Sequence, residues 1–166
     1  MVAPLSLIVS SFSTVKDVRK TITPDLKPGK SVLMLLDVGR GRNRLGGSAL
    51  AQVYNQAGQT PPDLDDPALM VRFFNAVQEM IENGLLLAYH DRSDGGLFVT
   101  LAEMAFGGRI GLEARLDELG DDPTASLFAE ELGAVLQIPE DKLNAVNELI
   151  RRYDLSGISR IIGEPI

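Results

Sequence analysis

The sequence predicts an α/β (α+β) sandwich, in which helices pack on a mixed sheet of about six strands. Short runs rich in valine, isoleucine and leucine are bounded by proline and glycine, as buried strands are. Between these runs, apolar residues recur at helical spacing. Strands and helices alternate along the chain, but not strictly enough to predict an all-parallel sheet.

The first half of the chain is expected to hold two strands and two helices. Strands are predicted at residues 5–12 and 31–38, and the stretch GRGRNRLGGSALAQVYNQ then predicts a turn that leads into a helix near residues 47–49. A second helix of about four turns is expected to start at Pro67 and to end at Asn83-Gly84. Its helical spacing is carried by Met70, Phe74, Val77 and Ile81.

The second half continues the alternation. Residues 85–89 are too short for another helix and predict a strand. The next helix is expected to bury Leu97, Leu101, Met104 and Ala105 and to end at Gly107-Gly108. We then expect a strand at residues 110–114, a short helix at 125–132 and a strand at 134–138. A helix opened by Pro139 follows, with Leu143, Val146 and Ile150 on its buried face. A closing strand is expected at residues 157–162.

Composition narrows the class of protein. The 166 residues are enough for one core, and we expect a single domain over residues 1–166, whose strand-like start is that of an excised domain. The net charge of −7 is spread along the chain, which argues against nucleic acid or an acidic membrane as partner. Cysteine is absent, so thiolate metal sites and a cysteine nucleophile are excluded. Without a membrane span or secretory signal in the sequence, a cytoplasmic location is expected.

The stretch HDRSDGG, residues 90–96, lies between a predicted strand and a predicted helix. The start of a helix leaves four backbone N–H groups unpaired and attracts anions. Gly95 and Gly96 carry no side chain that would hold a phosphate away from these groups, and Ser93 adds a hydroxyl. Asp91, at the strand end, is placed to hold Mg²⁺, which binds carboxylate and phosphate oxygens. The stretch therefore predicts a site for a magnesium-bound phosphate ester.

A structural interpretation of the same residues stays open. Ser93 or Asp94 can cap the helix, the glycines can serve a tight turn, and Asp91 can pair with Arg92 or another cation. Short glycine motifs often occur without a ligand. His90, the only histidine, is more often a hydrogen-bonded structural residue than a ligand or base.

A second candidate site is the stretch GRGRNRLGGS. Arg40, Arg42 and Arg44 are followed by Gly47 and Ser48 at a predicted helix start. Guanidinium groups match phosphate oxygens in paired geometry, so this turn is a candidate nucleotide-binding element. The alternative is a solvated basic turn that balances an acidic surface.

The third candidate is the stretch LFAEELGAVLQI, in which Glu130 and Glu131 precede a glycine and a predicted strand. Two carboxylates can serve a metal or a substrate amine. Glutamates on a helix face are more often simply solvated, and this alternative also stays open.

The chain resembles the C-terminal domain in the second repeat of the large bacterial phosphoribosylformylglycinamidine synthases, also called formylglycinamide ribonucleotide amidotransferases. The likeness is carried in order by RLGGSALAQVY, AYHDRSDGGLFVTLAEMAFGGRIGL and LFAEELGAVLQI, and it extends over nearly the whole chain. It implies the fold of the C-terminal domain of aminoimidazole ribonucleotide synthetase. It also implies that the remaining repeat domains and a glutaminase domain of the same polypeptide are partners.

The resemblance implies a ligase reaction in purine biosynthesis. ATP and glutamine convert formylglycinamide ribonucleotide into formylglycinamidine ribonucleotide, with ADP, phosphate and glutamate as the other products. Because this chain has no cysteine, it cannot release ammonia from glutamine through a thiol, and we expect the isolated chain to be inactive.

The resemblance also assigns roles to residues. Asp91 matches the position of a magnesium ligand, and Ser93 matches a residue that contacts the nucleotide. The second repeat is associated with an auxiliary nucleotide, so Mg²⁺ with ATP or ADP is the expected cofactor. Two alternatives remain: a non-catalytic scaffold domain that binds a nucleotide, and a domain of another synthetase or kinase of the same superfamily.

Overall fold

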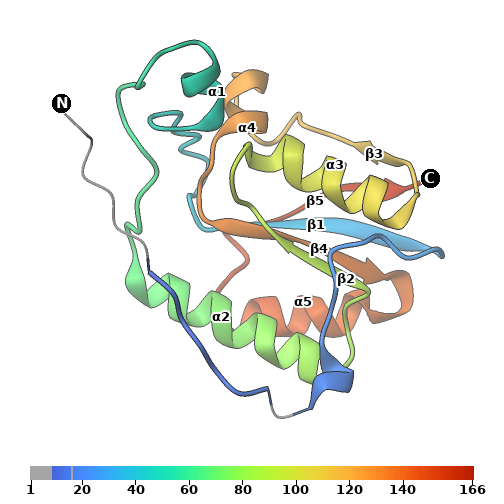
Figure 1. Ribbon diagram of the computed structural model, residues 1–166. Coiled ribbons are helices and arrows are strands. Elements are labelled where there is room, and N and C mark those ends of the chain that lie inside the picture. The colour runs from blue at the N-terminus through green and yellow to red at the C-terminus, as the bar shows by residue number, and fades with distance from the viewer. Residues whose placement is uncertain (1–8, 16) are drawn as a thin grey trace.

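The computed structural model describes residues 9–15 and 17–166, which form a five-stranded sheet covered by helices (Figure 1). The strands lie in the order β2-β4-β1-β5-β3, and each pair of neighbours is antiparallel. Their bounds are Ser31–Asp37 (β1), Ala88–Asp91 (β2), Leu112–Ala114 (β3), Gly133–Pro139 (β4) and Ser159–Pro165 (β5).

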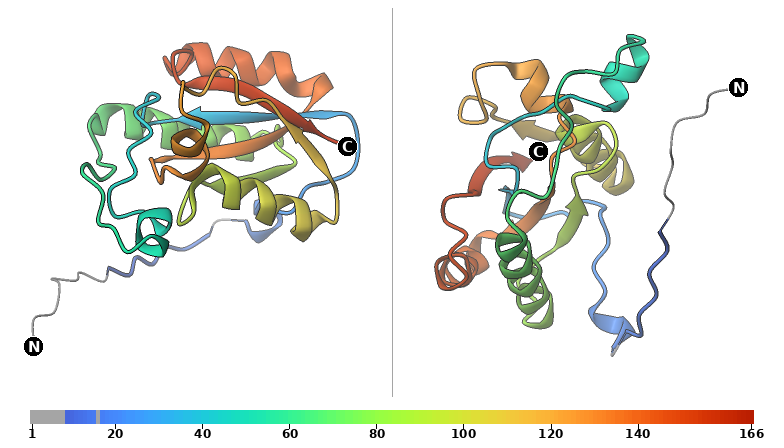
Figure 2. Two further views of the ribbon diagram at one scale, coloured as in Figure 1. Left: turned by 90° about the horizontal axis from the view of Figure 1, so that it is seen from above. Right: turned by 90° about the vertical axis from the view of Figure 1, so that its left-hand side faces the viewer.

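The predicted α/β sandwich is confirmed, with five antiparallel strands where about six in a mixed sheet were expected. The sixth was the strand predicted at residues 5–12, of which residues 5–8 lie outside the described part of the chain. Residues 9–12 are exposed and form no strand, so the prediction is wrong there. Residues 9–15 lie outside the layers of the domain (Figure 2), where no neighbouring strand pairs with them.

Helices cover both faces of the sheet. Helices α2 (Pro67–Glu82) and α5 (Leu143–Arg152) lie on one face, and α3 (Gly96–Gly108) lies on the other (Figure 1). Within the described residues, no helix is long and apolar enough to cross a membrane. The shorter helices are α1 (Ala49–Val53), α4 (Pro123–Phe128) and the 3₁₀ turns η1 (Val18–Lys20) and η2 (Glu140–Lys142).

The core has two parts because successive side chains of a strand point to opposite faces. In β1, Met34 and Leu36 pack toward α2 and α5, whereas Leu33 and Leu35 pack toward α3. All four side chains are at most 3% exposed. A strand buried on both faces explains the unbroken apolar run that predicted it.

The predicted extent of α2 is confirmed, but its buried face is not the predicted one. Phe74 is 57% exposed, whereas its neighbour Phe73 is 5% exposed and lies in the core. Of the residues expected inside, Val77 is buried, and Met70 and Ile81 are partly buried. The helix is therefore rotated by about one residue, or about 100°, from the predicted orientation.

The order of the strands brings three loops together at one end of the strands. Strands β1 and β2 are both antiparallel to β4, so they run in the same direction and end where β4 begins. Asp37 of β1 pairs with Gly133, and Asp91 of β2 pairs with Ala134. The loops that follow Asp37 and Asp91 therefore meet the segment that precedes Gly133.

Candidate functional site

The stretch HDRSDGG joins β2 to α3, as predicted, and its glycines are required by the backbone. Gly95 and Gly96 have φ angles of +82° and +69°, in the left-handed region that favours glycine. A Cβ atom on Gly96 would lie 2.7 Å from the carbonyl oxygen of Leu127 and 2.8 Å from that of Ala129. The start of α3 therefore packs directly against the backbone at the end of α4.

Asp91 lies on the surface at the end of β2. Its side chain is 67% exposed, and its Oδ2 accepts a hydrogen bond of 2.7 Å from the hydroxyl of Ser93. The carboxylate is thus turned toward solvent and held by Ser93 rather than by Arg92. Burial and the charge of Asp91 raise the pKa of the neighbouring Tyr89 to about 12, so this phenol stays protonated.

The surroundings of Asp91 fit a metal only in part. Among the described residues, no three histidine, aspartate or glutamate side chains lie together in a way that could hold a metal ion. Mg²⁺ commonly uses one or two carboxylates together with waters and substrate phosphates. Asp91 fits the role of one such carboxylate, and the other ligands of the ion would have to come from outside the surroundings of Asp91.

His90 has a structural position. Its Nε2 lies 2.9 Å from Oε2 of Glu103 on α3, and its Nδ1 lies 2.7 Å from the carbonyl oxygen of Asp91. The imidazole therefore bridges the end of β2 to α3. This geometry agrees with the structural interpretation of the lone histidine.

The start of α3 has no side-chain cap among the described residues, so neither Ser93 nor Asp94 caps it. The amide of Gly95 instead donates a hydrogen bond of 2.8 Å to Oε1 of Glu130. The same oxygen accepts a second bond of 2.8 Å from the amide of Ala49, the first residue of α1. A carboxylate of this chain thus occupies the amide of Gly95, where the sequence predicted a phosphate.

Arg92 is buried, with 5% of its surface exposed. Its Nη2 donates to Oδ1 of Asp37 at 2.5 Å, and its Nε donates to the carbonyl oxygen of Glu131 at 2.6 Å. A third bond of 3.1 Å reaches the carbonyl oxygen of Leu132. Arg92 therefore fastens the loop to the edge of the sheet and is not available to a ligand.

The three arginines of the second candidate stretch are all paired with acidic residues. Arg40 lies 2.9 Å from Asp66, and Arg42 lies 2.7 Å from Asp65. These two arginine side chains are about half exposed, at 53% and 50%. They balance acidic neighbours, as the alternative interpretation of the stretch expected.

Arg44 is the most buried of the three arginines. Its Nε and Nη2 each donate to one oxygen of Glu131 at 2.7 Å, and Nη2 also reaches Asp65 at 2.8 Å. The side chain of Glu131 is fully buried, and that of Arg44 is 10% exposed. The planar guanidinium thus meets the carboxylate in paired geometry inside the protein.

Glu131 is ionised in this setting. Burial opposes its charge, but the hydrogen bonds from Arg44 and the charges of Arg44 and Arg92 outweigh burial and hold the pKa of Glu131 below its ordinary value. The same hydrogen bonds raise the pKa of Arg44. The pair is therefore charged on both sides at neutral pH.

Gly47 and Ser48 start α1, as predicted. Ser48 is fully buried, and its hydroxyl accepts a hydrogen bond from the amide of Ala51 and donates one to the carbonyl oxygen of Leu45. It is the N-cap of α1, with its oxygen already engaged. Gly47 is exposed, with a φ of +74°.

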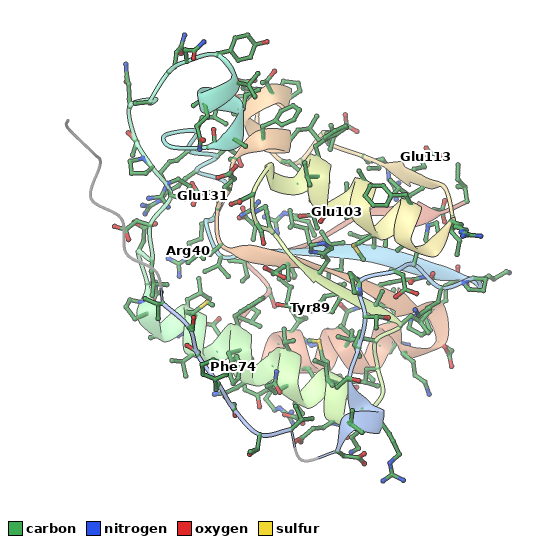
Figure 3. The ribbon with its side chains drawn as sticks, in the orientation of Figure 1. Arg40, Phe74, Tyr89, Glu103, Glu113 and Glu131 are labelled. Atoms are coloured by element: carbon green, nitrogen blue, oxygen red, sulfur yellow. The ribbon has the colours of Figure 1, made fainter. Side chains whose placement is uncertain are left out.

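The three stretches singled out in the sequence therefore meet at one edge of the sheet. Figure 3 shows Glu131 and Arg40 at this end of the molecule. Sequence reasoning missed Asp37, Asp65 and Asp66, which pair with the buried and exposed arginines. The signal for Asp37 was present, because it closes β1 as Asp91 closes β2.

Comparison with known proteins finds matches over most of the chain. A family model described as AIR synthase related protein, C-terminal domain, matches residues 27–165. The structure of PurLQS from Thermotoga maritima superposes with a TM-score of 0.70 at 20% identity, covering 90% of this chain and 24% of that chain. Phosphoribosylformylglycinamidine synthase II from the same organism gives 0.67 at 19%, with the same coverage.

A third structure belongs to a different protein. Hydrogenase maturation protein HypE in complex with ATP superposes with a TM-score of 0.61 at 15% identity, covering 89% of this chain and 46% of that chain. At these identities the superpositions show a shared fold. This chain spans about a quarter of the first two proteins.

Proposed function

The chain belongs to the family of C-terminal domains of AIR synthase-related proteins, and we propose that it serves in a phosphoribosylformylglycinamidine synthase of the large bacterial type. It would be the C-terminal domain of the second repeat, formed by residues 1–166 as one unit. The ordered likeness of three sequence stretches and the shared fold with the Thermotoga maritima synthase support this proposal. The reaction with ATP and glutamine, in the cytoplasm, would belong to the whole polypeptide.

Within that enzyme, the domain would contribute to an auxiliary Mg²⁺-nucleotide site. The observation that carries this role is the exposed carboxylate of Asp91, hydrogen-bonded to Ser93 beside the uncapped start of α3. Bound Mg²⁺ would join carboxylate and phosphate oxygens and offset their mutual repulsion. Asp91 would hold the ion, and Ser93 and the first turn of α3 would face the phosphates, because the amides of Gly95 and Gly96 are already bound to Glu130 and to the carbonyl oxygen of Ser93.

The test is Asp91→Ala in the intact enzyme that carries this domain, with turnover and thermal stability measured on the same preparations. If the site contributes to catalysis, turnover falls while the melting temperature stays unchanged. If neither changes, Asp91 has no part in a nucleotide site. The 166-residue chain alone is expected to show no turnover with glutamine or ammonia.

A non-catalytic scaffold is the second candidate, and the contact between Glu130 and Gly95 favours it. Because this carboxylate already satisfies the amide of Gly95, the edge of the sheet is held together without a ligand. Under this alternative, Asp91→Ala lowers stability in the presence of nucleotide but leaves turnover per folded molecule near normal. The fold shared with HypE also keeps open another synthetase or kinase, which substrate assays of the intact protein would identify.

A further inference from the structure

We propose that Glu130 is a positioning residue that fixes the loop carrying Asp91 and Ser93 for its ligand. This inference rests on the proposed nucleotide site and extends it to a residue with no assigned role there. Glu130 follows α4 and lies outside the loop it holds, so it acts through contacts with that loop's backbone.

The contact is a single carboxylate oxygen shared by two helix starts. Oε1 of Glu130 accepts from the amide of Gly95, which precedes α3, and from the amide of Ala49, which opens α1, each at 2.8 Å. Hydrogen bonds to a charged acceptor are stronger than neutral ones, and the partial positive charge at the start of α3 favours a carboxylate there. One oxygen thus joins the start of α1, which follows the stretch GRGRNRLGGS, to the HDRSDGG loop.

Glu130 is itself held by fixed neighbours. Ala129 before it is fully buried, and Glu131 after it is clamped by the two donors of Arg44. The carbonyl oxygen of Glu131 also accepts from Arg92. Since both flanking residues are anchored to the interior, the backbone at Glu130 is held in place, and its carboxylate can fix the position of the loop.

From Glu130 the constraint reaches Asp91 in three short steps. Gly95 is bound to Glu130, the amide of the adjoining Gly96 donates to the carbonyl oxygen of Ser93 at 3.0 Å, and the hydroxyl of Ser93 donates to Asp91. Removing the Glu130 carboxylate frees the Gly95 end of this chain of contacts. The orientation of the Asp91 carboxylate would then be less restricted, and its ligand would bind less tightly.

The test compares Glu130→Ala and Glu130→Gln with Asp122→Ala in the full 166-residue chain. Asp122 is a matched control because its carboxylate also accepts from two amides at a helix start, those of Thr124 and Ala125 at 2.9 and 3.2 Å, and neither bond involves the HDRSDGG loop. Nuclear magnetic resonance measures amide exchange at Gly95 and Ala49, and titration with Mg²⁺-ADP gives the dissociation constant.

Glu130→Ala is expected to speed exchange at both amides and to weaken Mg²⁺-ADP binding by about tenfold, the loss that corresponds to one charge-assisted hydrogen bond. Glu130→Gln keeps an acceptor oxygen and is expected to restore part of both losses. Asp122→Ala is expected to lower the stability of the chain about as much as Glu130→Ala does, but to leave Mg²⁺-ADP binding unchanged. In an Asp91→Ala background, Glu130→Ala is expected to add little further loss, because it acts through Asp91.

Each alternative outcome has a separate meaning. If neither this chain nor the intact enzyme that carries it binds Mg²⁺-ADP at this loop, the nucleotide site is wrong, while the exchange data still report on the two contacts of Glu130. If the chain binds but Glu130→Ala and Asp122→Ala weaken binding equally, Glu130 only adds stability and the inference is overturned. Unchanged exchange at Gly95 and Ala49 in Glu130→Ala overturns it as well.

Discussion

The guanidinium of Arg92 and the carboxylate of Asp37 form a buried ion pair that joins residues 55 positions apart in sequence. The side chains are 1% and 14% exposed. Arg92 follows β2 and Asp37 ends β1, so the pair spans the start of β4, which lies between them. The pair fixes the HDRSDGG loop to the end of β1, and the bonds of Arg92 to Glu131 and Leu132 fix it to the residues that precede β4.

Removing one partner of this pair is expected to be costly. Arg92→Met leaves Oδ1 of Asp37 and two backbone carbonyl oxygens without the donor that Arg92 supplies, and should lower the free energy of unfolding by about 3 kcal/mol. Urea denaturation measures this change. Arg19→Met is the control, because Arg19 pairs with Asp17 at the surface and should change stability by less than about 1 kcal/mol. Equal effects of the two substitutions would contradict the assigned role of Arg92.

Gly96→Ala and Gly47→Ala separate backbone strain from close packing. Both glycines have positive φ angles, but a Cβ atom at Gly96 would meet backbone atoms of α4, whereas at Gly47 nothing lies within 4 Å. We expect Gly47→Ala to cost about 1 kcal/mol from strain, and Gly96→Ala to cost about 3 kcal/mol or more. Thermal unfolding of the two variants is the measurement, and similar costs would show that α3 does not pack against α4 as described.

The charged state of Glu131 predicts a dependence of stability on pH. A carboxyl group with a lowered pKa in the folded state adds stability above its unfolded-state pKa and loses it as the pH falls through its folded-state pKa. Glu131→Gln should therefore be less stable than the unmodified chain at pH 7, and the difference should narrow below the ordinary value of 4.5. Urea denaturation between pH 7 and pH 3 tests this, since a constant difference would mean that Glu131 is not ionised beside Arg44.

Phe73 and Phe74 provide a test of the orientation of α2. Phe73 is 5% exposed and Phe74 is 57% exposed. Phe73→Ala should cost about 3 to 5 kcal/mol because it opens a cavity in the core, whereas Phe74→Ala should cost less than about 1 kcal/mol. If chemical denaturation gave the opposite order, the sequence-based orientation of the helix would be the correct one.

The orientation of α2 shows where periodicity stops being informative. The strands and the longer helices followed from apolar runs, spacing and glycine or proline boundaries. In α2, however, two neighbouring apolar stripes both have helical spacing, and they carry Leu69, Phe73 and Met80 on one side and Met70, Phe74 and Ile81 on the other. Only the position of the helix against β1 and β4 decides which stripe is buried.

The candidate site, like α2, could be predicted from the sequence only in part. Local sequence located the HDRSDGG loop, the exposed position of Asp91 at a strand end and the helix start at Gly96. It did not give the partners of Arg44, Arg92 or Glu130, because these contacts join segments 19 to 87 residues apart. They follow from the strand order, which places β4 between β1 and β2, and no short motif encodes that order.

The most direct test of the central claim is a titration of the ¹⁵N-labelled 166-residue chain with Mg²⁺-ADP, compared with its Asp91→Asn and Asp94→Asn variants. Asp94 is an exposed carboxylate in the same loop, so its variant makes the same charge change at a neighbouring position. The account predicts shifts at Ser93 to Gly96 that require Mg²⁺, persist in Asp94→Asn and vanish in Asp91→Asn. Saturable binding with shifts elsewhere, or equal binding by both variants, would contradict it.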